Sequence, residues 1–334
     1  MFANETHLPC VAMKQTRNIA KKRLKDKAVL NLKGIKMAGF DESFRSIMVS
    51  TRSKLSLKNA NLLVEREEKQ PVSVPLSDIS TIILESPAIM LTSALLSALA
   101  ENKIVLLCSD ASHSPNGIFM PYLTHFQSNA VIKSQIVQTK QHKAILWQNI
   151  IKAKIKNQAN FASKFDKNVG DELLNLSKRV VLNDAKNCEG VAAGKYFKTL
   201  FGSDFVRDEP IWANSALNYV YAIIRSCVVR NIVASGLLPV FGVGHDNIYN
   251  NFNLADDLME PYRIYGDRLV VSLCDDSKDT FLSTADKKAL AGILSDEVKI
   301  GGQKFSLAMA IAKSVQSYKN SLVGGICELE FAEV

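Results

Sequence analysis

The sequence lacks the short motifs that mark the most common enzyme sites. It contains no Walker phosphate loop, no GxGxxG, no HExxH and no GxSxG. Its six cysteines lie far apart along the chain, so it holds neither a CxxC redox pair nor a zinc ribbon. A functional site in this chain must therefore be assembled from residues that are distant in sequence.

The sequence also lacks a long apolar segment that is free of charge. The most apolar stretch, 221–244, contains Arg225 and Arg230, and two arginines argue against a membrane-spanning helix. The N-terminus has no apolar core of the kind that secretory signals carry. Separated cysteines within apolar runs are typical of reduced, buried thiols. We therefore expect a cytoplasmic protein that has no membrane partner.

Acidic residues are missing from the part of the chain where lysine is frequent. The 334 residues carry 41 Lys+Arg and 33 Asp+Glu, which gives a formal net charge of +8. Residues 1–36 account for +7 of this charge, and residues 111–165 hold seven lysines with no arginine and no acid. The lysine block predicts contact with the phosphates of a nucleic acid, although a solvated helix face would give the same pattern.

Hydrophobic patterning divides the chain into a β-rich part and a helical part. Short runs rich in Ile, Val and Leu predict strands before residue 121, with one helix at 92–102. The strands are expected at 46–51, 62–66, 72–74, 79–84, 104–108 and 118–120. Helical spacing then predicts helices at 128–165, 190–201, 214–235 and 284–318, the last with a break at Gly301 and Gly302.

This change of pattern predicts an α+β protein of two domains. We expect a β-rich N-terminal domain at 37–121 and a larger, all-α domain at 122–334. Residues 1–36 are expected to be a basic extension that is disordered or not native, since Met37 is a suitable natural start. A basic arm that grips DNA is the alternative for this extension.

One histidine stands out from the other four. His245 lies on a glycine-flanked turn in FGVGHDN, just after an apolar helix. Asp257 and Glu260 follow, and they share one face if their segment is helical, whereas Asp256 points about 100° away. A histidine on a loop with carboxylates on the next element is a common arrangement for binding a divalent metal. The two aspartates could equally cap a helix, with His245 bonded to a backbone carbonyl.

Two further residues leave this interpretation open. Pro261 disfavours helical geometry at Glu260, which is therefore expected at a kink or a helix end. Glu189 precedes the helix at 190–201, and a glutamate there is commonly only a favourable partner of the helix dipole. These residues by themselves do not choose between a metal site and structural roles.

Five segments, in order, give the sequence a resemblance to a known family. They read SKLSLK at 53–58, LESPAIMLTSALLS at 84–97, EGVAAGKYFKTLFG at 189–202, ALNYVYAIIR at 216–225, and ASGLLP at 234–239 followed by His245 and NLADDLMEPYR at 253–263. The chain resembles the CRISPR-associated integrase family, the endonuclease of CRISPR adaptation, from about Phe44 nearly to its C-terminus. It looks most like the type II branch, which accompanies a single-protein, RNA-guided effector nuclease.

The resemblance implies a fold, a cofactor and three catalytic residues. The family combines a β-sandwich N-terminal domain with an α-helical catalytic domain. Its glutamate, histidine and second carboxylate bind Mg²⁺ or Mn²⁺, and by motif match they fall on Glu189, His245 and Glu260. Asp257 matches a further acidic position near the metal. Asp246 departs from the family, in which a basic or neutral residue is expected after the histidine.

The resemblance also implies a reaction and partners. The family joins the 3′-hydroxyl ends of captured spacer DNA to phosphodiesters at the leader end of the repeat array, a transesterification that needs no enzyme nucleophile. The expected partners are double-stranded spacer and repeat DNA, a second copy in a homodimer, a small second adaptation protein, and the effector nuclease of the same prokaryotic system. A branched-DNA repair nuclease and a non-catalytic DNA-binding scaffold are the alternatives.

DNA contacts are expected mainly from the acid-free lysine block. Lysine without arginine favours contact with phosphates over the reading of bases. The expected residues are Lys133, Lys140, Lys143, Lys152, Lys154, Lys156 and Lys164, with Arg225, Arg230 and Arg263 as further candidates near His245.

Overall fold

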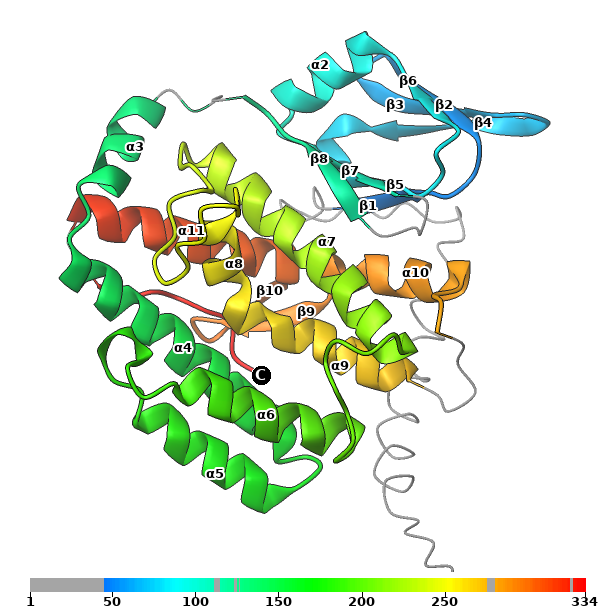
Figure 1. The fold of residues 1–334 in the computed structure, drawn as a ribbon. Helices are drawn as coiled ribbons and strands as arrows, with labels where there is room; N and C mark the ends of the chain where they lie inside the picture. Colours follow the sequence, from blue (N-terminus) through cyan, green and yellow to red (C-terminus); the bar gives the residue numbers. More distant parts are fainter. Residues whose placement is uncertain (1–44, 111–114, 123–124, 126, 275–279, 325–326) are drawn as a thin grey trace, which may run out of the picture.

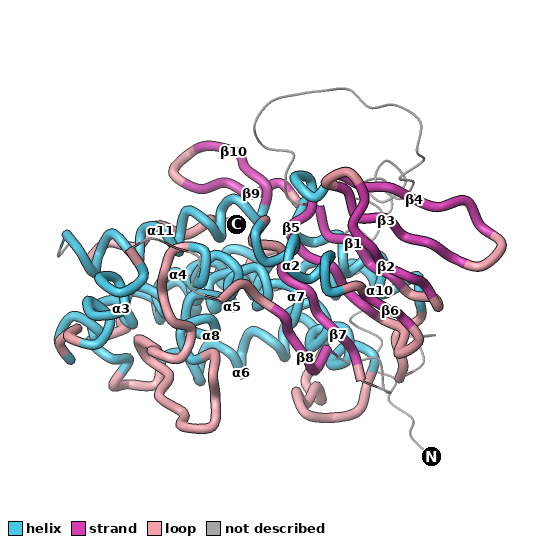
Figure 2. Tube along the Cα trace, turned by 90° about the horizontal axis from the view of Figure 1, so that it is seen from above, coloured by secondary structure: helices cyan, strands magenta, loops and turns pink. Residues whose placement is uncertain are grey.

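The computed structural model describes residues 45–110, 115–122, 125, 127–274, 280–324 and 327–334. The predicted basic extension at 1–36 and the suggested start at Met37 lie outside these residues. Within them, most strands come before residue 121 and most helices after it (Figure 1). Figure 2 shows the strands before residue 121 gathered on one side of the molecule and most of the helices on the other. The predicted α+β class is therefore confirmed.

The strands before residue 121 form two sheets. One has the order β1-β5-β7-β8, in which β1, β5 and β7 are parallel and β8 is antiparallel to β7. It consists of β1 (Arg45–Val49), β5 (Ile79–Leu84), β7 (Val105–Ser109) and β8 (Pro115–Phe119). The other has the order β4-β3-β2-β6 and consists of β2 (Ser53–Lys58), β3 (Asn61–Arg66), β4 (Lys69–Pro75) and β6 (Ile89–Leu91).

One hydrophobic core joins the two sheets to the helix α2 (Ser93–Glu101). Leu55 and Leu62 from one sheet, Ile82 from the other and Leu95 from α2 are fully buried in it. Ile83, the next residue of β5, instead joins the core of the helical part. Burial on both faces explains why β5 reads as an unbroken apolar run rather than an alternating one.

The helical part is built around two long helices, α4 (Lys140–Ala162) and α7 (Trp212–Ala234). α7 is buried over most of its length, because it packs against the other helices and one face of the first sheet. Further helices are α3 (Ser128–Ile136), α5 (Lys167–Lys178), α6 (Cys188–Phe201), α8 (Asn253–Met259), α9 (Arg263–Leu273), α10 (Thr284–Ala291) and α11 (Leu307–Gly324), with 3-10 turns η1 (Leu76–Asp78), η2 (Leu182–Asp184), η3 (Glu260–Tyr262) and η4 (Gly292–Ser295). In the described part of the chain, no helix is long and apolar enough to cross a membrane.

The expected all-α character of residues 122–334 is wrong at one place. An antiparallel hairpin is formed there by β9 (Glu297–Ile300) and β10 (Gln303–Ser306). Val298 and Ile300 are buried between exposed neighbours, which is the alternation of a half-buried strand. Gly301 and Gly302, expected to break a helix, instead form the hairpin turn with φ angles of 56° and 76°.

Helix boundaries also differ from the sequence pattern. The single helix expected at 128–165 is divided into α3 and α4, because Thr139 caps α4 by accepting a hydrogen bond from the backbone N–H of His142. The pattern does not predict α5, which begins after Asp166, whose carboxylate accepts two backbone N–H bonds. It does not predict α9 either.

Candidate functional site

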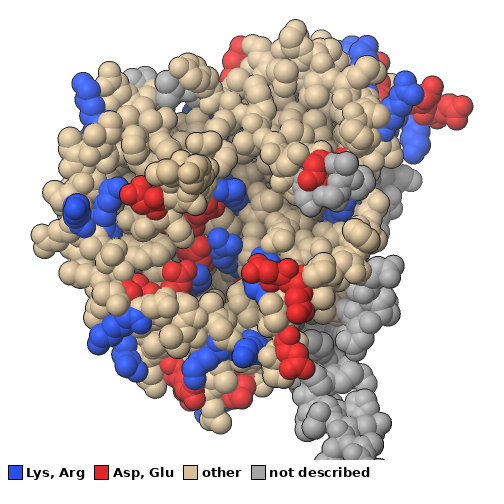
Figure 3. Space-filling view, in the orientation of Figure 1, with Lys and Arg blue, Asp and Glu red and all other residues tan. Residues whose placement is uncertain are grey.

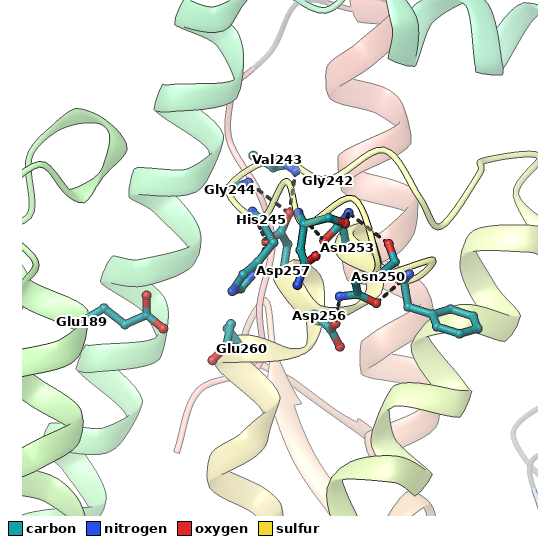
Figure 4. Close-up of polar contacts among 12 residues, drawn as sticks. Glu189, Gly242, Val243, Gly244, His245, Asn250, Asn253, Asp256, Asp257 and Glu260 are labelled. Atoms are coloured by element: carbon teal, nitrogen blue, oxygen red, sulfur yellow. Dashed lines mark hydrogen bonds and ion pairs between the residues drawn. The ribbon is translucent and has the colours of Figure 1, made fainter. Parts of the chain in front are cut away.

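Three separate segments meet in the middle of the helical part. Figure 4 shows Glu189 reaching from one side toward Glu260 and His245, which come from the other side. Glu189 lies in the first turn of α6, His245 on the connection between α7 and α8, and Glu260 at the junction of α8 and η3. The three residues expected to be catalytic thus lie in one region of the fold.

The start of α6 is fixed by side chains that bond to its free backbone N–H groups. Asp184 accepts hydrogen bonds from the N–H groups of Cys188 and Glu189, both at 2.9 Å. Asn187, in a left-handed conformation, accepts one from Gly190. Because these contacts fix the first turn, Glu189 projects from a well-defined helix end.

Asp257 anchors the loop that carries His245. Its fully buried carboxylate accepts backbone N–H bonds from Val243 at 2.5 Å, from Gly244 at 3.0 Å and from His245 at 3.0 Å. Its Oδ1 also lies 2.6 Å from Nδ1 of the His245 ring. A carboxylate in this place keeps the ring proton on Nδ1 and leaves Nε2 able to bind a metal. Asp257 therefore lies behind His245, with both oxygens already engaged.

The same contact changes the pKa of His245. The hydrogen bond with Asp257 raises this pKa above its ordinary value of 6.5, and it outweighs burial, which acts in the opposite direction. The charges of Asp257, Glu260 and Glu189 add to the increase. The ring therefore takes up a proton more readily than an isolated histidine does.

Two glycines let this loop approach its neighbours closely. A Cβ atom at Gly242 would lie 2.1 Å from the His245 carbonyl oxygen, and one at Gly244 would lie 2.2 Å from the Trp147 ring. Trp147 also packs edge-on against the His245 ring, with the ring centroids 5.4 Å apart. Lys143 donates a hydrogen bond to the Gly242 carbonyl at 2.9 Å. Helix α4 thus supports the loop that presents His245.

Glu260 lies where α8 ends, in agreement with the helix end that Pro261 predicts. Its side chain is 4% exposed, and its Oε1 accepts a hydrogen bond from Nε of Arg263 at 2.9 Å. Burial alone would raise the pKa of Glu260, but the charges of Arg263 and Lys154 outweigh burial and hold this pKa at about 2. Glu260 is therefore ionised at neutral pH.

The Lys154 ammonium stands between the two glutamates. Its Nζ lies 2.6 Å from Oε1 of Glu189 and 2.6 Å from Oε2 of Glu260. Burial works to lower the pKa of Lys154, yet Glu260 and Glu189 outweigh burial and raise it. Lys154 is only 9% exposed, so it lies inside the site rather than on the outer face where a DNA contact is expected.

The donor atoms of the site suit a hard divalent cation. They combine two carboxylates with an imidazole held through Nδ1, a mixture that Mn²⁺ tolerates better than Mg²⁺. Glu260 Oε2 is buried and receives no well-aligned hydrogen bond, although the Lys154 ammonium lies beside it. Among the residues that the structure describes, however, no three His, Cys, Asp or Glu side chains form a ready metal-binding group. Lys154 lies between two of the donors that would form one.

Charged neighbours surround this cluster. Asp256 accepts a hydrogen bond from Arg225 at 2.9 Å, and Arg225 also lies over the Phe252 ring. Asp246 is exposed beside His245. Arg230, farther along α7, donates to the carbonyl of Lys103 at 2.6 Å. Figure 3 shows acidic and basic side chains next to one another in the middle of this face, so much of the local charge is balanced.

A cleft of about 420 Å³ opens beside His245. It lies between α7 and the strands β7 and β8 of the first sheet, and its walls include Arg207, Arg225 and Arg263 together with Asp256, the partner of Arg225. Of the three residues expected to be catalytic, His245 lines this cleft.

The lysines expected to bind DNA do not share one environment. Three are exposed on α3, on α4 and just beyond α4: Lys133, Lys140 and Lys164. Lys156 is exposed but pairs with Glu333 at 2.8 Å, and Lys152 is half-buried. Lys143 and Lys154 contact the His245 loop and the two glutamates. The acid-free stretch therefore supplies both an outer surface and part of the site.

The sequence interpretation missed the roles of Trp147 and Lys154, although a signal for them exists. Lys154 follows Trp147 by seven residues, which places the two on the same face of α4. Ile150 and Ile151 lie between them on this face and are fully buried. A lysine on the apolar stripe of a long helix indicates a buried charge that has acidic partners.

Comparison with known proteins identifies relatives of this chain. The family described as CRISPR associated protein Cas1 matches residues 47–299. The CRISPR-associated endonuclease Cas1 of Neisseria meningitidis serogroup C is 36% identical over 279 residues, which cover 83% of this chain and 91% of that protein.

Solved structures share the fold. A casposase bound to an integration product has a TM-score of 0.70 at 20% identity, over 86% of this chain and 92% of that chain. A chain of a Cas6-RT-Cas1–Cas2 complex has a TM-score of 0.68 at 16% identity, over 95% of this chain and 42% of that chain.

Proposed function

The chain belongs to the CRISPR-associated Cas1 family, and from this premise we propose that it is the DNA integrase and endonuclease of a CRISPR adaptation system. It joins the 3′-hydroxyl ends of captured spacer DNA to the repeat array by transesterification. Its substrate is double-stranded DNA, and its cofactor is Mg²⁺ or Mn²⁺.

The convergence of Glu189 and Glu260 on a position that holds a positive charge, with His245 in the same region, supports this proposal most strongly. The Lys154 ammonium lies 2.6 Å from both glutamates, which marks the position as favourable for a cation. Glu189 and Glu260 would supply oxygen ligands, and Nε2 of His245 would supply a nitrogen. When bound, the metal ion would neutralise charge on the reacting phosphate and orient the attacking 3′-oxygen.

Other side chains prepare these three residues. Asp257 keeps the His245 proton on Nδ1, so that Nε2 can act as a ligand. Arg263 keeps Glu260 ionised and fixes the direction of its carboxylate. The arginines of the cleft attract the phosphates of the DNA backbone. Because the attacking oxygen belongs to DNA, no side chain has to become a covalent nucleophile.

The names of the relatives support the same class of reaction. The Neisseria relative is named an endonuclease, and the casposase was captured with an integration product. A chain of the same fold occurs in a complex named for Cas2. We propose accordingly that this chain works as a homodimer with a small second adaptation protein, on spacer and repeat DNA, alongside the RNA-guided effector nuclease.

A strand-transfer assay tests the proposal. Labelled double-stranded DNA with free 3′-hydroxyl ends is mixed with a plasmid that carries a leader and a repeat, in Mn²⁺ or in EDTA, with or without the small second protein. We expect label to enter the plasmid at the leader end only when both metal and partner are present. The His245→Ala variant is expected to stay folded and to lose this joining.

Each other outcome favours a different function. Cutting of branched DNA that needs no partner would favour a repair nuclease. DNA binding with neither cutting nor joining, in Mn²⁺ as in EDTA, would favour a scaffold. Joining by a variant that lacks both His245 and Glu260 would overturn the assignment of the site.

A further inference from the structure

Lys154 has an unusual place for a lysine in a helix of this kind. It lies on the inner face of α4 next to the fully buried Ile151 and Ile155, and its ammonium is the partner of two converging carboxylates. A lysine that is this buried is uncommon unless acidic groups compensate its charge. Glu189 and Glu260 provide that compensation at equal distances of 2.6 Å.

The position of this ammonium conflicts with that of a divalent ion shared by Glu189 and Glu260. An ion bound by both carboxylates must lie between them, and this is where Nζ of Lys154 lies. Two cations in contact in a buried site would repel strongly. The lysine head group therefore has to leave when such an ion enters, and its four-carbon stem allows that movement without a shift of α4.

We propose that Lys154 is an internal cation that holds Glu189 and Glu260 together in the metal-free protein, and that the divalent ion enters by exchange with its ammonium. This inference rests on the proposed function, since it takes the two glutamates as metal ligands. Without Lys154, the two carboxylates would face each other with less compensation, because Arg263 contacts only Glu260 among them. The exchange keeps the empty site assembled and makes metal binding weaker than the same ligands would otherwise give.

The direct test measures Mn²⁺ binding rather than DNA joining. In the Lys154→Met variant the competing charge is removed, so the dissociation constant for Mn²⁺, measured by isothermal titration calorimetry, should fall by at least about tenfold. The melting temperature in EDTA should fall as well, because the carboxylates then repel each other. The increase in melting temperature on adding Mn²⁺ should be larger than in the unchanged protein.

Two further variants serve as controls for this test. Lys156→Met removes a lysine of the same helix that is exposed and pairs with Glu333, so it should leave the affinity for Mn²⁺ unchanged. Lys154→Gln loses the charge but keeps a hydrogen-bond donor for one glutamate. It should bind Mn²⁺ more tightly than the unchanged protein even if Lys154→Met does not fold.

The possible results separate this inference from the proposed function. If the unchanged protein and Lys154→Gln bind Mn²⁺ equally, or the variant binds it more weakly, the exchange is overturned while the metal site stands. If neither protein binds Mn²⁺, the metal site itself is overturned together with the exchange. If Lys154→Gln binds Mn²⁺ more tightly and Glu260→Gln abolishes Mn²⁺ binding, the results would support both the metal site and the exchange.

Discussion

The same residue type occurs in two different surroundings on and beside α4. Lys154 is buried inside the site between two carboxylates, whereas Lys140 at the start of α4 and Lys164 just beyond its end are exposed. All three belong to one acid-free stretch of sequence. The difference teaches that burial and counter-ions, rather than composition, decide whether a lysine here serves the site or the surface.

The energetic effect of replacing a lysine differs between the buried site and the exposed surface. Removing one partner of a buried ion pair typically costs about 3–5 kcal/mol, because the other charge is left uncompensated. An exposed lysine typically contributes less than about 1 kcal/mol to stability. Its main effect is instead on the attraction of phosphates, which salt weakens. Changes inside the site should therefore act on metal binding and chemistry, and changes at the exposed lysines on DNA affinity.

The largest effect is expected inside the site, at Glu260. Glu260→Gln keeps the size of the side chain but removes the charge that Arg263 and Lys154 stabilise. We expect strand joining at saturating DNA to fall by about 1,000-fold or more, since metal-assisted charge stabilisation depends on this carboxylate. Single-turnover joining rates measure this loss. A variant with more than a tenth of the normal rate would contradict the role of Glu260.

A smaller loss is expected when the support of His245 is changed. In Asp257→Asn, an NH₂ group replaces an oxygen that accepts backbone N–H bonds, so donor would face donor in the loop. We expect joining to fall by about 10- to 100-fold. Asp256→Asn is the matched control, because the Asp256 carboxylate contacts Arg225 and Asn250 rather than the backbone N–H groups of residues 243–245. Equal losses in both variants would count against a special role of Asp257.

The site should also respond to pH. A ligating His245 must be neutral, and Asp257 raises its pKa above 6.5, so joining should fall about tenfold per pH unit as the pH drops below this raised pKa. Glu260, with a pKa of about 2, does not titrate in this range. Rates of joining from pH 5.5 to 8.5 measure this decrease. In Asp257→Asn the decrease should begin at a lower pH, and an unchanged pH dependence would contradict the assignment to His245.

The smallest effects are expected at the exposed lysines. Lys140→Ala and Lys164→Ala should each weaken DNA binding a few-fold, independently of the DNA sequence. Each should also reduce by about one the slope of the logarithm of affinity against the logarithm of salt concentration. Fluorescence anisotropy with two unrelated duplexes at several salt concentrations checks both effects. Unchanged slopes would show that these lysines lie away from the DNA path.

Much of the fold could be predicted because its signals are local. The continuous apolar run of β5 and the helical spacing within α7 each reflect burial of the element on most of its sides. The hairpin β9–β10 was missed because each strand has only four residues, which is too short for its alternation to stand out from the helical spacing on either side. Gly301 and Gly302 were noticed, but a break in a helix and a tight turn look alike in sequence.

The site was only partly predictable for a different reason. Glu189, His245 and Glu260 came from the match to family motifs, whereas their spacing alone left structural roles open. The support by Asp257 depends on a loop that folds back over α8, which brings three backbone N–H groups to one carboxylate. The partnership of Lys154 depends on contacts with residues 35 and 106 positions away in the chain. The local pattern indicates a buried charge at Lys154, but it does not indicate which acidic residues are its partners.

A crystal structure of the Mn²⁺-loaded protein, with the metal located by its anomalous scattering, tests the central claim most directly. The account predicts one Mn²⁺ ion bound by the carboxylates of Glu189 and Glu260 and by Nε2 of His245, with Asp257 still on Nδ1. It also predicts that Nζ of Lys154 has left its place between the glutamates. A Mn²⁺ ion bound elsewhere, or a Lys154 ammonium that remains between Glu189 and Glu260 in the loaded protein, would contradict it.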